Sequence, residues 1–327
     1  MTDHSFDWAD LAFGSKKPVN ELKAIFIAAP RELSIKRFTQ LVKEYLPQGN
    51  IVLGLAKENY IDDFDGQPQF TTLHINKVQN IIDKVNTTMA GPHTIYTLHY
   101  FQRETPYLLQ KLHFQKVIFI NGSWHRSLHL RPEYYILANS QTPYEMVSPF
   151  ADEQEAKDYA KKCDTSNAKR LADYQADLKT YTDKTLMEVA QKAATLSFDY
   201  THQTGVALAK KQVAGTYKLL ATAFNRVVPY QTYAMHHGSE REKHFSPAHD
   251  LNFYDTVHAE TELLVKALRQ KFDLRGTSLF INLLPCPTCA RMLAETDIDE
   301  VVYQEDHSDG YAARLLSEVG KQIRRVL

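Results

Sequence analysis

Three side chains that bind metals, those of His258, Cys286 and Cys289, lie near the C-terminal end of the sequence together with an acid, Glu260. One imidazole and two thiolates form a soft ligand set that suits a tetrahedral Zn²⁺ with its fourth position open. Glu260 is close to the histidine in sequence and is not needed as a ligand. An open position on zinc lowers the pKa of a water toward neutrality, and a nearby carboxylate can move its protons. These residues therefore predict a hydrolytic zinc site.

The elements around these residues place them at the starts of two helices. Residues 257–271 are predicted to form a helix with His258 and Glu260 in its first turn, because apolar residues recur at helical spacing, at Leu263, Leu264, Ala267 and Leu268. Side chains two residues apart do not share a helix face, so the histidine can bind metal while the acid faces substrate. Residues 277–284 are predicted to form a buried strand that Pro285 ends. Cys286 and Cys289 then open a second helix, where the helix dipole favours thiolates.

The alternative to a metal site is a core histidine and two unrelated buried thiols. That interpretation is the better one for a single histidine or cysteine. The order of all four residues, each at the predicted start of a helix, favours the metal site instead.

Composition places the chain among ordinary globular proteins. Its 327 residues are enough for about two domains, and 43% are hydrophobic and 24% charged. The formal net charge is −1, which gives no overall attraction for polyanions and weighs against a nucleic-acid substrate without excluding one. Three cysteines form no disulfide framework, and neither a signal peptide nor a membrane-spanning run is recognised. We therefore expect a cytoplasmic protein with no membrane contact.

The first half of the chain alternates predicted strands and helices, with strands at 24–29, 51–56, 93–100 and 116–120. This order is typical of an α/β domain with a Rossmann-like parallel sheet. We expect this domain at residues 1–150, a helical connector at 151–181 and a second α/β domain at 182–327. The predicted elements of the second domain are helices at 182–200 and 310–319 and strands at 205–210, 218–224, 301–303 and 322–326.

Loops that follow the first-half strands are candidates for a ligand site, because ligands bind beyond the carboxyl ends of such strands. Asn121, Ser123, Trp124 and Arg126 could hold an anion, and the acids between Glu58 and Asp65 could hold Mg²⁺. Ordinary surface turns, in which such polar residues are frequent, would account for the same residues equally well. Neither a phosphate-binding P-loop nor a dinucleotide fingerprint is present. Our hypothesis for this domain is nucleotide binding or regulation.

The second half resembles the cytidine deaminase superfamily and is most similar to its deoxycytidylate deaminase branch. The resemblance covers residues 182–327 and rests on the His258-Ala259-Glu260 and Pro285-Cys286-Pro287-Thr288-Cys289 motifs, the strand entry at 203–206, Ala223-Phe224-Asn225 and the closing strand at 300–303. The histidine motif followed by the two-cysteine motif is the signature of zinc deaminases. The sequence departs from the family pattern at two positions. Asp297 stands where the family often has glycine. Leu284 stands where the family commonly has a polar residue, so the backbone must make one contact with the substrate in its place. No family is recognised in the first half.

This resemblance implies a three-layer α/β/α deaminase fold and hydrolytic deamination. It makes His258, Cys286 and Cys289 zinc ligands and Glu260 the group that moves protons to the ring and to the departing ammonia. Asn225 is expected to bind the sugar, with Ala259 and Leu284 beside the substrate, and the phosphate contacts are expected at Arg226, Arg241 and Lys243. Relatives commonly form oligomers, so the resemblance also implies a homo-oligomer.

The substrate remains open at this point. A cytosine mononucleotide such as dCMP is the first choice, and a base in RNA or single-stranded DNA is the second, with Tyr230, Tyr233 and Tyr254 available for stacking. A third hypothesis is a non-catalytic regulator that senses a nucleotide, although Glu260 argues against it. The histidines between 236 and 249 could form a second, structural metal site or only a polar loop.

Overall fold

The computed structural model describes residues 4–88, 91–178, 180–212, 215–247, 250, 252–306 and 309–326. Its contacts divide the chain into two compact units. The first unit contains residues 1–159 and 232–254, and the second contains residues 160–231 and 255–327. Within the described residues, no helix has both the length and the apolar character that crossing a membrane requires.

The first unit is built on a parallel sheet whose inner strands are short and largely buried. All pairs of neighbouring strands in it are parallel, in the order β1-β4-β3-β2-β5-β6. The strands are β1 (Ser5–Asp7), β2 (Ala24–Ala28), β3 (Asn50–Ala56), β4 (Ile95–Tyr100), β5 (Lys116–Ile120) and β6 (Tyr144–Val147). This arrangement confirms the Rossmann-like parallel sheet. The two strands that were not predicted, β1 and β6, are the short outer strands of the sheet.

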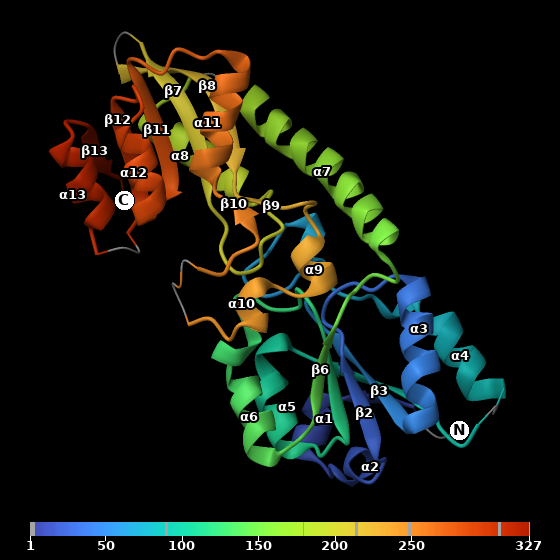
Figure 1. Cartoon of the computed structure of the whole chain (residues 1–327). Coiled ribbons are helices and arrows are strands. Elements are labelled where there is room, and N and C mark those ends of the chain that lie inside the picture. Colours follow the sequence, from blue (N-terminus) through green and yellow to red (C-terminus); the bar gives the residue numbers. More distant parts are fainter. Residues whose placement is uncertain are drawn as a thin grey trace. The chain divides into compact units, whose positions relative to one another are not determined.

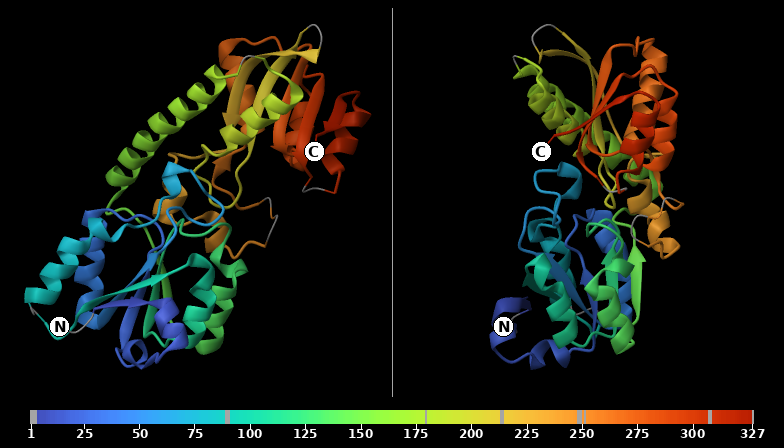
Figure 2. Two further views of the ribbon diagram at one scale, coloured as in Figure 1. Left: turned by 180° about the vertical axis from the view of Figure 1, so that it is seen from behind. Right: turned by 90° about the vertical axis from the view of Figure 1, so that its left-hand side faces the viewer.

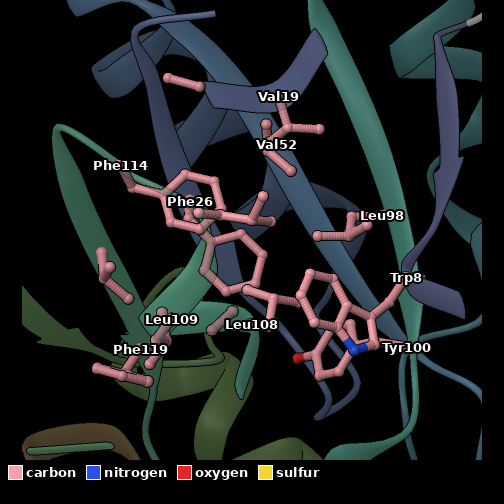
Figure 3. Packing of buried hydrophobic residues seen from close by; sticks show 14 of the residues in the cluster. Trp8, Val19, Phe26, Val52, Leu98, Tyr100, Leu108, Leu109, Phe114 and Phe119 are labelled. Carbon is pink, nitrogen blue, oxygen red and sulfur yellow. The ribbon is translucent and has the colours of Figure 1, made fainter. Parts of the chain in front are cut away.

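Helices cover both faces of this sheet (Figure 1), since alternate strand residues point to opposite sides. One face packs on α1 (Trp8–Phe13), α2 (Lys17–Asn20), α5 (Thr105–Lys111) and α6 (Pro132–Ser140). Figure 3 shows this core, in which the rings of Phe26 and Phe114 stack with centroids 4.6 Å apart. The opposite face packs on α3 (Ile35–Tyr45) and α4 (Gln79–Thr88). Short 3₁₀ turns complete the unit at Leu46–Gln48, Pro68–Phe70, Ile75–Lys77, Gln102–Glu104 and Leu128–Leu130.

The second unit has a mixed five-stranded sheet in the order β13-β12-β11-β7-β8. Its strands are β7 (Gly205–Lys211), β8 (Tyr217–Phe224), β11 (Thr277–Leu283), β12 (Glu300–Glu305) and β13 (Gln322–Arg325). Strands β11, β12 and β13 run parallel, whereas β7 is antiparallel to both of its neighbours. A separate antiparallel pair joins β9 (Arg226–Val227) to β10 (Thr256–Val257).

Three layers result, because helices pack on both faces of this second sheet (Figure 2). One face carries α8 (Asp183–Ala194), and the other carries α11 (Ala259–Gln270), α12 (Pro287–Ala294) and α13 (Tyr311–Glu318). Gly205 lets α8 approach the sheet closely. A β-carbon at this position would lie 2.1 Å from the Ala190 carbonyl oxygen and 2.3 Å from the Ala194 nitrogen. The expected α/β/α architecture is confirmed.

Two segments depart from the expected organisation. The predicted connector is mostly one helix, α7 (Glu153–Ala176), which begins in the first unit and continues into the second. Residues 232–254, which lie in the second half of the sequence, pack in the first unit. They include two short helices, α9 (Tyr233–His237) and α10 (Glu240–Lys243). Residues of this segment form hydrogen bonds with residues 88 to 118 positions away, which local sequence patterns do not reveal.

Candidate metal centre

Three ligand atoms converge in the second unit. The Nδ1 atom of His258 lies 3.6 Å from the Cys286 sulfur and 3.3 Å from the Cys289 sulfur. A tetrahedral zinc ion with ordinary bond lengths separates a nitrogen and a sulfur ligand by about 3.6 Å. The three side chains therefore fit such an ion. In the part of the chain that the structure describes, they are the only group of three potential ligands whose atoms all lie within 4.8 Å of one another.

Two helix starts bring these atoms together. His258 follows β10 and is the N-cap of α11, one position earlier than the predicted first turn. Cys286 follows β11 and is the N-cap of α12, where Pro287 takes the first helical position and needs no hydrogen-bond partner. The Cys286 sulfur accepts a hydrogen bond from the Cys289 backbone nitrogen at 3.4 Å. The local sequence thus fixes both cysteines on one turn.

The thiols lie in surroundings that favour a thiolate. Hydrogen bonds from Cys289 and from the His258 imidazole lower the pKa of Cys286 to about 4. The same shared proton and the burial of the site raise the pKa of Cys289. A divalent ion would displace that proton, because a coordinating thiol is deprotonated. The pair therefore offers one thiolate readily and a second on metal binding.

Glu260 is almost completely buried in the first turn of α11, with 3% of its surface exposed. Burial raises the pKa of its carboxyl group, an effect that the nearby His258 opposes. A raised pKa brings a carboxyl group closer to neutral pH, where it can both accept and donate a proton. Ala259, beside it, is fully buried.

Asn225 holds the loop that precedes β7. Its Oδ1 atom accepts a hydrogen bond from the Thr204 nitrogen at 2.9 Å, and its Nδ2 atom donates to the His202 carbonyl at 2.8 Å and to the Asp199 carboxylate at 3.2 Å. Asp199 is itself 8% exposed and also accepts from the Thr201 backbone and hydroxyl. Asp199 was not predicted from the sequence, where its only local signal is an acid two residues before a threonine.

Asn282, which was not predicted either, ties the same loop to β11. Its Oδ1 atom accepts from the Gly205 nitrogen at 2.8 Å, and its Nδ2 atom donates to the Gln203 carbonyl at 3.0 Å. Nothing in the local sequence distinguishes it, since its partners lie more than 70 positions away.

The remaining predicted substrate contacts fall in both units. Leu284 is fully buried in the second unit, and Arg226 on β9 lies 3.6 Å from Glu262 with 42% of its side chain exposed. Arg241 and Lys243 belong to the first unit. The Arg241 side chain is buried and donates to the Asp250 carbonyl, and Lys243 pairs with Glu240 at 2.6 Å. These two cations therefore have partners of their own.

The candidate ligand-binding residues of the first half lie in the loop that follows β5, as the predicted strand at 116–120 implies. Asn121, Ser123 and Trp124 are buried there, whereas Arg126 is exposed. Among the described residues, neither the acids between Glu58 and Asp65 nor the histidines at 236, 237 and 244 form a group of three potential metal ligands. His249 lies outside the described residues.

Comparisons with known proteins point to the same stretch. Residues 180–305 match the family described as the cytidine and deoxycytidylate deaminase zinc-binding region. Deoxycytidylate deaminase of Enterobacteria phage T2 is 29% identical over 66 residues, which are 20% of this chain and 35% of the phage protein. The probable deoxycytidylate deaminase of Drosophila melanogaster is 34% identical over 86 residues, 25% of this chain and 41% of the fly protein. The chain thus spans less than half the length of these relatives.

One solved structure with a similar course of the chain is that of dCMP deaminase from the cyanophage S-TIM5 in its apo form. The similarity covers 44% of this chain and 96% of the cyanophage protein, with 19% identity and a TM-score of 0.33.

Proposed function

Because residues 180–305 belong to the cytidine and deoxycytidylate deaminase superfamily, we propose that the protein is a zinc-dependent enzyme that deaminates a cytosine mononucleotide by hydrolysis. The products would be the uracil nucleotide and ammonia. The observation that carries this proposal is the approach of His258, Cys286 and Cys289 to one another, with the buried acid Glu260 on the same helix start.

His258, Cys286 and Cys289 would hold the ion. A zinc ion, when bound, supplies Lewis-acid activation of a water molecule at neutral pH. The ligand set supports zinc because two sulfurs and one nitrogen favour it over Mg²⁺ or Ca²⁺, which prefer oxygen. Three protein ligands are also the number found in catalytic zinc sites, which keep a fourth position for reactants.

Glu260 is the residue we assign to proton transfer. Its carboxylate would accept a proton from water and deliver it to the ring nitrogen of the base. It would then accept the second proton of that water and give it to the amino group, which leaves as ammonia. Burial supports this role, because it raises the pKa of the carboxyl group and keeps solvent away from it. Glu260 shares the start of α11 with His258, whereas Cys286 and Cys289 reach the site from the start of α12.

The proposed substrate is a cytosine mononucleotide such as dCMP. Both relatives described above are named deoxycytidylate deaminases, although each match is short. Asn225 would position the sugar through the loop from Asp199 to Thr204, which it holds with three hydrogen bonds. Arg226 is our first candidate for the phosphate contact, because it adjoins Asn225 and its ion pair with Glu262 is long, at 3.6 Å, and partly exposed.

One experiment tests both the chemistry and the substrate. The purified full chain is measured for zinc content and for ammonia release from dCMP, dCTP, cytidine, adenosine and single-stranded DNA. We expect one zinc ion per chain and the fastest release from dCMP. Release from single-stranded DNA but not from nucleotides would replace the mononucleotide assignment. A zinc-loaded protein that releases no ammonia from any of them would overturn the proposed activity.

A further inference from the structure

A cation lies on the short strand pair that leads to the metal centre. In the antiparallel ladder of β9 and β10, Arg226 is paired with Val257, the residue that precedes His258 (Figure 1). The α-carbons of directly paired residues in such a ladder are about 4.5–5.5 Å apart. Arg226 also follows Asn225, whose side chain holds the loop before β7. The Arg226 side chain therefore starts from the backbone beside a proposed zinc ligand.

Glu262 is the ionic partner of this cation, and the contact between the two side chains is weak. The Glu262 carboxylate lies 3.6 Å from a terminal nitrogen of the Arg226 guanidinium, which is beyond the range of a hydrogen bond. The Arg226 side chain is 42% exposed and that of Glu262 is 28% exposed. Ion pairs in such positions contribute little to stability, because water screens the charges. The pair is therefore easily replaced by a closer acceptor.

One donor of the Arg226 guanidinium lacks an acceptor. Its Nε atom is buried and has no hydrogen-bond partner among the described residues, although buried donors in folded proteins nearly always have one. Burial raises the pKa of Asp164 on α7, while a hydrogen bond from Gln231 and the charge of Arg226 act to lower it. The guanidinium is thus within electrostatic reach of a second carboxyl group, which accepts its hydrogen bond from Gln231 at 3.3 Å.

A phosphate group suits this guanidinium better than the carboxylate of Glu262 does. A planar guanidinium can donate two parallel hydrogen bonds to a phosphate, and a phosphate monoester carries a charge of about −1.5 to −2 at neutral pH. A phosphate in direct contact with Arg226 should therefore displace Glu262, whereas a nucleoside without a phosphate leaves the ion pair as it is. Helix α11 keeps the displaced carboxylate nearby, where it repels the bound phosphate.

We propose that Glu262 is a specificity-determining residue that competes with the phosphate of the substrate for Arg226. Arg226 gives the site its preference for a nucleotide over the corresponding nucleoside, and Glu262 limits how tightly the nucleotide is held, which favours release of the product. This role rests on the proposed function, since the nucleotide must bind beside the metal centre for its phosphate to reach Arg226. Both residues belong to the second unit.

Binding of the reaction product separates this competition from turnover. The zinc-loaded full chain is titrated by calorimetry with dUMP and with deoxyuridine, which differ only in the phosphate. The variants are Glu262→Gln, Arg226→Gln and the two combined, and the melting temperature of each shows whether it is folded. Asp273→Asn is the matched control, because Asp273 forms an exposed ion pair with Arg275 at 2.9 Å in the same unit.

We expect the wild type to bind dUMP at least about tenfold more tightly than deoxyuridine. Glu262→Gln should tighten dUMP binding about two- to fivefold, as the loss of an exposed ion pair predicts, and should leave deoxyuridine binding unchanged. Arg226→Gln should weaken dUMP binding about 10- to 100-fold through the loss of charged hydrogen bonds. In that variant the further change Glu262→Gln should have no effect, because the two residues act on one interaction. Asp273→Asn should bind both ligands as the wild type does.

The competition is overturned if Glu262→Gln weakens dUMP binding or changes the binding of both ligands by the same factor. It is also overturned if Arg226→Gln keeps the preference for dUMP, or if neither ligand binds at millimolar concentration. A chain with an Arg226-dependent preference that releases no ammonia would contradict the proposed activity and leave this role of Glu262 standing. Ammonia release from dCMP together with an unchanged preference in Arg226→Gln would do the reverse.

Discussion

The Glu242 carboxylate accepts a hydrogen bond from the Trp124 indole nitrogen at 2.9 Å, although the two residues lie 118 positions apart in the sequence. The same oxygen accepts from the Leu128 backbone nitrogen at 3.0 Å. Glu242 belongs to the segment 232–254, which leaves the second unit after β9 and returns to it before β10. Strand β10 leads directly to His258. The Glu242 carboxylate therefore fixes the segment 232–254, which lies in the sequence between Asn225 and the proposed metal ligand His258.

Removal of the Glu242 carboxylate should destabilise the first unit. Glu242 is 7% exposed, so Glu242→Ala leaves two buried donors without an acceptor and is expected to cost about 2–4 kcal/mol of unfolding free energy. Glu242→Gln keeps an amide oxygen in the same place and should cost about 1 kcal/mol or less. Both variants are made in a chain that also carries Trp8→Phe, which leaves Trp124 as the only tryptophan. Denaturant unfolding, followed by the fluorescence of Trp124, gives the unfolding midpoint of each variant. Equal midpoints for the two would show that the hydrogen bonds contribute little.

Loss of a thiol ligand should remove the metal. We expect Cys286→Ser and Cys289→Ser to lower zinc content from one ion per chain to near zero and to abolish ammonia release. Cys163→Ala is the matched control, because Cys163 is buried in α7 and is not part of the ligand group. Metal binding stabilises the folded state, so a chelator should lower the melting temperature of the wild type and of Cys163→Ala but not of Cys286→Ser. Full zinc content in both ligand variants would refute the assigned centre.

Glu260→Gln should separate metal binding from turnover. The amide fills the same buried space but cannot accept and release a proton, so ammonia release should fall by about 10²–10⁴-fold while zinc content stays at the wild-type value. Zinc analysis and steady-state rates with dCMP measure the two effects on one preparation. Glu318→Gln, at the exposed end of α13, is the control and should retain activity. Near-wild-type rates for Glu260→Gln would remove this residue from proton transfer.

Glu300 is expected to make the second unit sensitive to acid. Burial alone would raise the pKa of this side chain, but hydrogen bonds from Ser278, Lys211 and Arg324 outweigh burial and hold the pKa below its usual value. A lowered pKa in the folded state means that the stabilisation is complete above the ordinary glutamate pKa of about 4.3 and is lost as the pH falls through the folded value.

Glu300→Gln tests this dependence. At neutral pH the variant should be less stable by about 1–2 kcal/mol, a figure reduced because Lys211 and Arg324 are partly exposed. The difference from wild type should shrink as the pH falls below the ordinary glutamate pKa of about 4.3 and through the lower folded value, where the wild-type carboxylate becomes protonated as well. Unfolding at a series of pH values measures it, with the exposed Glu318→Gln as control. A difference that stays constant from pH 7 to pH 3 would contradict the assignment.

Gly205→Ala should destabilise the second unit through backbone contact. The added methyl group would meet the Ala190 carbonyl oxygen and the Ala194 nitrogen, and these helix backbone atoms cannot rotate aside as a side chain can. We expect a loss of about 1–3 kcal/mol, measured as a lower melting temperature. Gly91→Ala is the comparison, since nothing lies within 4 Å of its β-carbon position. Similar melting temperatures for the two variants would show that α8 can shift away at little cost.

Short-range features of the sequence determined most of the strands and the placement of the two cysteines. The strands at 24–28, 50–56, 116–120 and 277–283 each contain consecutive apolar residues, which indicate burial on both faces of a sheet. The two cysteines lie on one turn because Pro285 ends a strand and Pro287 suits a helix start. The resemblance to the deaminase superfamily also rests on residues close together in the sequence, because a single helix start sets the spacing within each motif.

Only the tertiary structure decided which unit takes the segment 232–254. The segment is polar and has no apolar period, so its position depends on hydrogen bonds such as the one from Trp124 to Glu242. The roles of Asp199 and Asn282 also depend on partners brought near by folding. The outer strands β1 and β6 were missed because each pairs on one side only and is half-exposed, which leaves a weak apolar pattern. Contacts between residues far apart in the sequence produce no local pattern of apolar and polar residues. They can therefore be identified only from the folded structure.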